Sequence, residues 1–376
     1  MSLFNKLCAE LESSPNKHKL GSGWVSGVLA LILASTALGA VLILRYPQSL
    51  STPEIRSAVD ASLFRIIVQG ILVIAFVLSL ISLILREKRL MGLTAITIII
   101  ISVILGGAQA QQAIATSGKV YLALDWFMLN LLFTGILFLP LERLFYRRPQ
   151  AVFRAEWRED LFYFFISSIM VQGLTYLSLA PTMALLQLVE GAEFRHWTGN
   201  QPLWLQLLAI MFFTDLVQYW VHRAFHVIPF LWRFHSVHHS AKTLDWLAGS
   251  RMHILEIIAL RAMTVIPMYL LGFSTTVIYV YLVIVYVYAT YIHANVKWDI
   301  EWLKPFIVTP RFHHWHHGIE KEAVDVNFAI HFPILDRIFG TYYMPKGQWP
   351  SGYGVGGHPV PQGYLKQFAY PFTRKA

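Results

Sequence analysis

The stretch LFRIIVQGILVIAFVLSLISLIL occupies residues 63–85, and the charged sequence REKR follows it at residues 86–89. Its length matches the roughly 20 apolar residues that a helix needs to cross the hydrocarbon core of a bilayer. The whole chain has the same character, because 56% of its 376 residues are hydrophobic and only 14% are charged. This composition excludes an ordinary soluble domain and predicts an all-α integral membrane protein.

The chain contains about eight apolar segments that fit membrane-spanning helices. In order, they are Val25–Leu44, Leu63–Leu85, Leu93–Ala110, Val120–Pro140, Leu161–Val189, Leu203–Val221, Ile254–Leu271 and Thr275–Ile292. The segment Leu161–Val189 is longer than one crossing and contains Pro181, so we expect a kinked or tilted span there.

Basic residues are concentrated beside these spans, at residues 86–89 and 142–160. Because Lys and Arg are enriched in cytoplasmic loops, both stretches and the N-terminus are predicted to lie in the cytoplasm. This flanking pattern also accounts for the formal net charge of +9, and nucleic-acid binding is not expected. We predict a multi-pass protein of the bacterial inner membrane or, in a eukaryote, of the endoplasmic reticulum.

The N-terminal residues and the cysteine content restrict the kind of membrane protein further. Cys8 is the only cysteine, which excludes an intramolecular disulfide and a metal site built from thiolates. The first twenty residues are polar and mixed in charge, without the apolar core of a signal peptide. We therefore expect the first span to be retained as a membrane helix.

Histidines gather in three short motifs, which read HRAFH at residues 222–226, HSVHH at 235–239 and HHWHH at 313–317. Residues three and four apart share one face of a helix, so each motif can aim two or three imidazoles at one point. Neutral imidazole is a good ligand for iron, copper, nickel and zinc. These motifs, with His293 and His253 nearby, offer more ligands than one octahedral ion can use, so two metal ions are expected. The predicted spans place all three motifs on the cytoplasmic side.

Two acidic residues are candidates for holding the second ring nitrogen of a metal ligand. Asp215 lies two helical turns before His222 on the same predicted face, and an aspartate inside an apolar span is costly unless it has a function. Glu256 lies one turn after His253. Two irons bound by imidazoles can use O2 and two electrons to oxidise an unactivated C–H bond. The core lacks the paired glutamates of ferritin-like di-iron proteins.

The motifs together resemble those of the fatty acid hydroxylase/sterol desaturase superfamily. The resemblance rests on the three histidine motifs, on Arg251-x-His253-x-x-Glu256, on His293-Ala-Asn295, on PRFHHWHH at 310–317, on DVNF at 325–328 and on DRIFGTY at 336–342. It covers roughly residues 155–345. It implies a membrane-bound di-iron oxygenase that hydroxylates or desaturates a lipid at the cytoplasmic face, and zinc is a possible replacement for iron in purified protein.

The resemblance also implies a set of metal ligands. The histidines that match the family motifs, which are also the implied catalytic residues, are His222, His226, His235, His238, His239, His313, His316 and His317. His293 is a further implied ligand, and His253 is either a ligand or a residue that supports one. His314 stands where the family often has a non-ligand. Lys297 interrupts a histidine pair that fatty acid 2-hydroxylases have, which favours the sterol desaturase side of the superfamily.

The domain organisation and the partners follow from the extent of the resemblance. Residues 1–150 lie outside it and are predicted to form a module of about four spans with unknown function. Residues 151–345 are the predicted catalytic core, and residues 346–376 a Gly- and Pro-rich irregular tail. No cytochrome b5 domain is fused to the core, so a separate donor of cytochrome b5, ferredoxin or reductase type is expected. Sterol, fatty acyl, sphingoid, ether lipid and carotenoid substrates all stay open.

Two other functions compete with the oxygenase. A zinc-dependent membrane lipid hydrolase uses a metal-bound water and needs only three protein ligands, fewer than the motifs offer. A non-enzymatic metal-binding protein or transporter is expected to carry its ionisable groups near the bilayer midplane, whereas these histidines lie at span ends. The oxygenase is therefore favoured. The isolated histidines, interpreted as structural or solvated, are His18, His196, His331 and His358.

Overall fold

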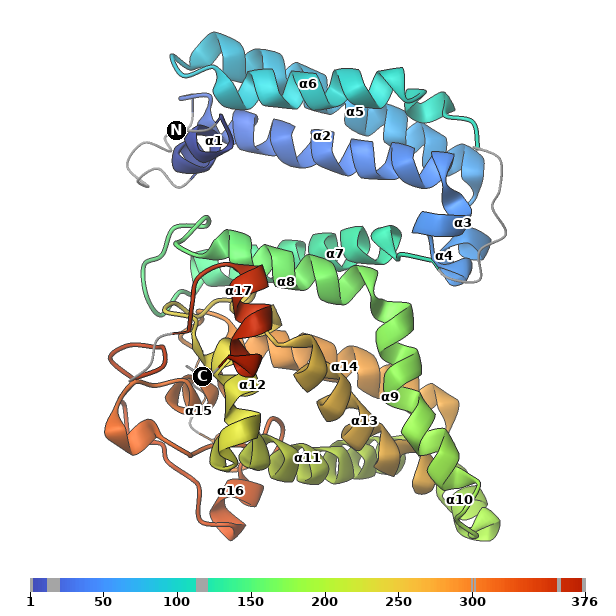
Figure 1. Ribbon diagram of the computed structural model, residues 1–376, viewed down its shortest axis with the longest axis vertical. Helices are drawn as coiled ribbons and strands as arrows, with labels where there is room; N and C mark the ends of the chain where they lie inside the picture. Colours follow the sequence, from blue (N-terminus) through green and yellow to red (C-terminus); the bar gives the residue numbers. More distant parts are fainter. Residues whose placement is uncertain are drawn as a thin grey trace. The chain divides into compact units, whose positions relative to one another are not determined.

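The computed structural model describes residues 3–11, 21–112, 121–298, 300, 302–356 and 360–373. Within these ranges the chain is helical and has no strand, only isolated β-bridges between Tyr146 and Val296 and between Gly318 and Tyr353. The chain divides into two compact units (Figure 1). The N-terminal unit comprises Met1–Phe133, Gln150–Ala155 and Ser168–Gln172, and the C-terminal unit comprises Thr134–Pro149, Glu156–Ser167 and Gly173–Ala376.

The N-terminal unit is built on three long helices that pack closely against one another. They are α2 (Trp24–Arg45), α5 (Ala61–Leu85) and α6 (Leu90–Ile104), with the short helices α1 (Leu3–Leu11), α3 (Pro47–Leu50), α4 (Pro53–Ala58) and η2 (Gly107–Gln109) at their ends. Ala30, Ala34 and Ala37 of α2 are fully buried along one face. Small side chains at this spacing let helix backbones approach closely in a membrane, where no hydrophobic effect drives them together.

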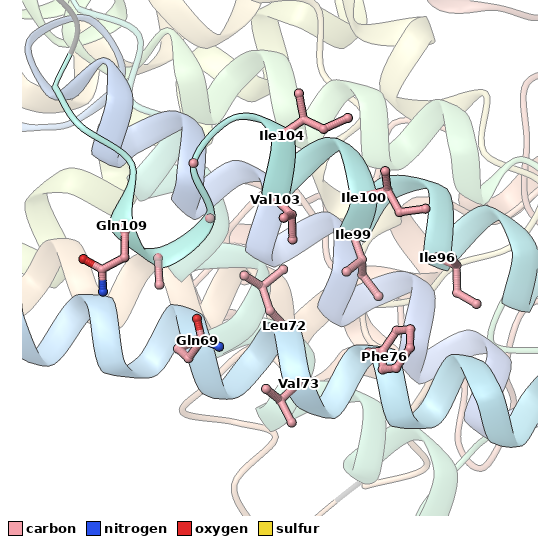
Figure 2. A pocket seen from close by; sticks show the side chains of 13 residues that line it. Gln69, Leu72, Val73, Phe76, Ile96, Ile99, Ile100, Val103, Ile104 and Gln109 are labelled. Atoms are coloured by element: carbon pink, nitrogen blue, oxygen red, sulfur yellow. The ribbon is translucent and has the colours of Figure 1, made fainter.

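An apolar groove lies between α5, α6 and η2 (Figure 2). Its volume is about 620 Å³, and its lining is aliphatic or aromatic except for Gln69, Gln109 and the backbone of η2. Within the same unit, Asp125 near the start of α7 (Leu124–Leu144) binds the segment between α3 and α4. It accepts hydrogen bonds from Ser51 Oγ at 2.9 Å and from the backbone N–H of Thr52 at 2.7 Å.

The C-terminal unit holds the three histidine motifs. Its helices are the second part of α7, most of α8 (Trp157–Ile169) and α9 (Val171–Leu186), and then α10 (Ala192–Gly199), α11 (Leu203–Val227), α12 (Pro229–His239), η3 (Ala248–Ser250), α13 (Ile254–Leu270), α14 (Thr275–His293), α15 (Pro310–His316), η4 (Lys321–Ala323), α16 (Ile334–Ile338), α17 (Tyr364–Ala369) and η5 (Tyr370–Phe372). Helix α11 packs against α12, α13 and α14. Pro229 and Pro310 each stand at the first position of a histidine-bearing helix, where proline favours helix initiation.

The membrane-spanning helices differ in number from the sequence prediction. Among the described residues, six helices are long and apolar enough to cross a bilayer, namely Trp24–Arg45, Ala61–Leu85, Leu90–Gln109, Leu124–Leu144, Leu203–Val227 and Thr275–His293. Helices α8 and α9 could together form a seventh span, with a bend of 64° at Met170 rather than at Pro181. Helix α13 has 17 residues, so it is about 26 Å long and shorter than a hydrocarbon core of about 30 Å. The predicted eight spans are therefore not confirmed.

Candidate metal centre

Nine histidines of the C-terminal unit converge into two adjacent groups. Site A contains His222, His226, His235, His239 and His316, and site B contains His238, His293, His313 and His317. In each group, the candidate ligand nitrogens lie within 4.8 Å of one another. These are the eight motif histidines together with His293, so the structure brings together every residue that was predicted as a metal ligand except His253.

Helix geometry distributes the histidines of α12 between the two sites. His235 and His239 are four residues apart and share the helix face that contributes to site A. His238 lies one residue before His239, and therefore on a different side of the helix, and it contributes to site B. The third motif repeats this division, because His313 of α15 and His317 at its C-terminal cap enter site B, whereas His316 enters site A. Two short helices therefore supply ligands to both sites.

The Nε2 atoms of neighbouring rings face each other at close range in both sites. The pairs are His222–His235, His235–His239 and His239–His316 in site A, each at 3.1 Å, and His238–His293, His293–His313 and His313–His317 in site B, at 3.2, 3.0 and 3.2 Å. Two ligand atoms at right angles on a metal with bonds of about 2.1 Å lie about 3.0 Å apart. The observed spacings are those of ligands around a shared ion.

The hydrogen bonds of the outer ring nitrogens show why these contacts need a cation. His238 Nδ1 donates to the carbonyl oxygen of Arg251 at 3.0 Å, and His293 Nδ1 donates to that of Ala289 at 2.7 Å. A carbonyl oxygen only accepts, so in each neutral ring Nδ1 carries the hydrogen and Nε2 presents a lone pair. The lone pairs of His238 and His293 therefore face each other across 3.2 Å. A metal ion between them turns this repulsion into two bonds, so the residues fit a metal centre.

The protonation state of the rings also suits metal binding. Burial lowers the pKa of His235, His238 and His239 on α12 well below the ordinary histidine value, and it does the same for the three ligand candidates of the third motif, His313, His316 and His317. Only a neutral imidazole can ligate a metal. In addition, His226 Nε2 is buried without a hydrogen-bond partner among the described residues, as expected for an atom whose partner is an ion.

Two carboxylates contact rings of site A. Glu256, which is fully buried, lies 2.5 Å from His235 Nδ1 through its Oε1 atom, so it lies next to a ring nitrogen of a candidate ligand. Asp325 Oδ1 lies 3.3 Å from His226 Nδ1, and its side chain is 49% exposed. The sequence interpretation did not single out Asp325 as such a partner, although it lies in the DVNF motif. The site B rings His238 and His293 donate instead to neutral backbone carbonyls.

Asp215 acts differently from the prediction, because it contacts no metal-site histidine in the described structure. Its carboxylate accepts backbone N–H groups from residues 330–332 at 2.9, 3.1 and 2.8 Å. Asp336 accepts two more from Phe328 and Ala329 at 2.7 and 2.9 Å. Together they hold a loop whose carbonyl at Phe328 accepts a hydrogen bond from His222 Nδ1 at 2.9 Å. Asp215 therefore supports site A through the loop backbone.

The other histidines of the described residues lie outside both sites. His253 caps α13 by accepting the N–H of Leu255 at Nδ1, and its Nε2 donates to the carbonyl of Phe368 at 3.1 Å, so both ring nitrogens are engaged. His314 contacts the Tyr353 hydroxyl at 2.7 Å. His331 is buried next to the Tyr281 hydroxyl, and His196 of α10 contacts Asn200, the C-cap residue of that helix. His18 and His358 lie outside the described residues.

Residues 207–341 match the family model described as fatty acid hydroxylase, and this range includes every histidine of sites A and B. The chain is 28% identical to an ornithine lipid hydroxylase of Rhizobium tropici over 254 residues, which cover 66% of this chain and 76% of that protein. It is 30% identical to the alkylglycerol monooxygenase of Danio rerio over 146 residues, or 39% of this chain and 31% of the relative. It is 28% identical to the lathosterol oxidase of Mus musculus over 197 residues, or 49% and 63% of the two chains. No solved structure matches the chain significantly.

Proposed function

The chain belongs to the fatty acid hydroxylase/sterol desaturase superfamily, and on this premise we propose that it is a membrane-bound di-iron oxygenase that hydroxylates a C–H bond of a lipid. O2 is the co-substrate, and a separate protein supplies two electrons. The observation that carries the proposal is that the Nε2 lone pairs of His238 and His293 face each other, since two such lone pairs need a cation between them. Iron is favoured because imidazole binds it well and because the relatives are a hydroxylase, a monooxygenase and an oxidase.

The roles of the protein are to bind the metals, to exclude water and to admit the lipid. Bound iron would supply the redox chemistry, while the residues supply its orientation and surroundings. His222 and His226 lie near the end of α11 and His293 ends α14, and both helices are candidate membrane spans. This position supports access for a lipid directly from the bilayer. The buried rings of α12 and α15 keep bulk water from the metals.

We propose a polar membrane lipid with acyl chains as the substrate class. The alignment with the ornithine lipid hydroxylase covers 66% of this chain and extends well beyond the matched hydroxylase domain. The alignment with the lathosterol oxidase covers 49% of it. The longer alignment supports hydroxylation of an acyl lipid, in contrast to the sterol desaturase side that Lys297 favours.

We further propose that both metal sites and the N-terminus lie on the cytoplasmic side, where a separate electron donor can reach them. Residues 1–150 would then form an additional membrane module, residues 151–345 the catalytic core and residues 346–376 a tail that packs on it.

The test combines isotope labelling with metal analysis. Cells that express the full chain are grown under ¹⁸O2 with ample iron, and their lipids are compared with those from cells that express His316→Ala. We expect one ¹⁸O atom in a membrane lipid and two irons per chain for the unmodified protein, and neither the labelled lipid nor the full iron content for His316→Ala. His196→Ala on α10 is the control and should behave like the unmodified protein. A lipid change that needs no O2 would contradict the oxygenase and favour the zinc hydrolase.

A further inference from the structure

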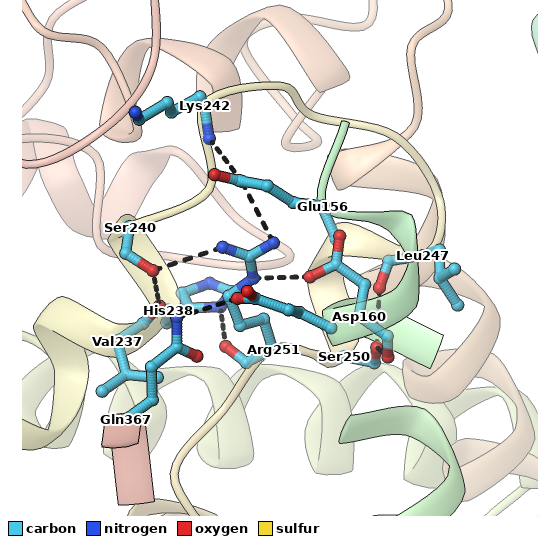
Figure 3. Close-up of polar contacts among 12 residues, drawn as sticks. Glu156, Asp160, Val237, His238, Ser240, Lys242, Leu247, Ser250, Arg251 and Gln367 are labelled. Carbon is cyan, nitrogen blue, oxygen red and sulfur yellow. Dashed lines mark hydrogen bonds and ion pairs between the residues drawn. The ribbon is translucent and has the colours of Figure 1, made fainter. Parts of the chain in front are cut away.

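Arg251 is among the most deeply buried charged side chains of the C-terminal unit, with 1% of its surface exposed. Its Nε donates to Asp160 Oδ1 at 2.5 Å, and one terminal nitrogen donates to Glu156 Oε2 at 3.2 Å. The other terminal nitrogen lies 3.4 Å from the hydroxyl of Ser240 (Figure 3). The guanidinium therefore connects the start of α8 with the C-terminal end of α12.

The same residue contacts site B through its backbone. The carbonyl oxygen of Arg251 accepts the hydrogen bond from His238 Nδ1 that fixes the tautomer and the direction of that ring. Ser240, which the guanidinium approaches, follows His238 by two residues, and Ser250 donates to the backbone carbonyl of Asp160 at 3.0 Å. The network thus holds the chain on both sides of the hydrogen bond between His238 and residue 251.

Site A does not share this support. The outer nitrogens of its rings contact Glu256, Asp325 and the carbonyls of Val326 and Phe328. None of these groups hydrogen-bonds to Arg251, Glu156 or Asp160 in the described structure. Moreover, Glu156 and Asp160 precede the matched residues 207–341, so the support of site B includes a part of the chain outside the hydroxylase domain.

We infer that Arg251 is a positioning residue that sets the orientation of His238 and thereby the metal affinity of site B separately from that of site A. The side chain fixes the direction of its own carbonyl, because its planar guanidinium makes several directed contacts that a lysine cannot reproduce. A buried charge that loses a partner is strongly destabilised, so the arrangement is rigid while all its members are present. The inference rests on the proposed function only in that iron occupies both sites.

The test uses the full chain, purified in detergent without metal and titrated with ⁵⁷Fe(II). We expect two irons per chain and two Mössbauer quadrupole doublets for the unmodified protein, because site A offers five imidazoles and site B four. In Arg251→Lys, the affinity of one site should fall about 10–100-fold, as for other residues that orient a metal ligand, and one doublet should be lost while the other is unchanged. Glu156→Gln should shift the same site in the same direction by a smaller factor, and it carries the test if Arg251→Lys does not fold.

Arg337→Gln is the matched control, since that exposed arginine stacks on Tyr342 and has no part in either site. It should bind two irons with both doublets intact. Two intact doublets in Arg251→Lys, or equal loss of both, would overturn the inference, the second because a general structural role lowers both sites together. An unmodified protein that binds no iron would instead refute the proposed function itself.

Discussion

Asp215→Asn tests the loop that supports site A. The carboxylate accepts three backbone N–H groups from residues 330–332, whereas an asparagine has one acceptor oxygen. At least one N–H must then face the NH2 group, which costs about 1–3 kcal/mol, and the retained bonds lose a charged acceptor at about 1 kcal/mol each. Part of this is offset because a neutral amide is easier to bury than a carboxylate, which leaves a net loss of roughly 2–4 kcal/mol.

The assay is thermal unfolding of the purified protein in detergent together with its iron content. For a unit of about 200 residues, this loss corresponds to a fall in Tm of roughly 4–16 °C. Because the loop supplies the carbonyl that orients His222, iron in site A should also bind more weakly. Glu193→Gln, an exposed change on α10, should alter neither quantity. An unchanged Tm would refute the role of Asp215 in holding this loop, and a lower Tm with normal iron binding would refute the link between the loop and site A.

Further changes test the other contacts of the two sites. Glu256→Gln should weaken iron in site A about 10–100-fold, measured by metal analysis after dialysis against a chelator. Gly249→Ala should weaken iron binding in site B, because the added Cβ would lie 3.0 Å from the ring of His293. Gly70→Ala is the control, since its added Cβ would have no atom within 4 Å, and this variant should bind iron normally. Burial lowers the pKa of His331 from 6.5 to about 4. Its neutral form therefore contributes roughly 3 kcal/mol that is present above pH 6.5 and lost as the pH falls toward 4. His331→Gln should flatten the dependence of Tm on pH in that window, and an unaltered slope would contradict the shift.

The sequence predicted the clustering of the histidines well, because spacings of three and four translate directly into a shared helix face. It could not assign individual rings to site A or site B. His238 and His239 are neighbours in the chain, and only the folded structure shows that the first joins His293, His313 and His317 while the second joins His222, His226, His235 and His316. Asp215 lies on a helix, as predicted, but its carboxylate contacts backbone N–H groups and not a ring nitrogen of a metal ligand. Its contacts lie 115–117 residues away and involve backbone atoms, which no side-chain pattern reveals.

The number of membrane spans and the Arg251 network also could not be predicted from the sequence. Helix α13 has nearly the predicted bounds, but its 17 residues are too few to cross a hydrocarbon core of about 30 Å. Asp160 and Arg251 are 91 residues apart, and each of them considered alone resembles the charged residues that commonly flank an apolar segment. Long-range pairing of charges therefore has to come from the structure.

The division of the histidines of α12 and α15 between sites A and B restricts insertions and deletions in these helices. One residue inserted between His235 and His239 would rotate everything after it by about 100° around the helix axis. Rings meant for one ion would then point toward the other or away from both. The connection between α14 and α15 lies outside these helices and carries no such restriction. Natural variation in length should therefore accumulate in that connection and be absent from two helical segments of only eleven and seven residues.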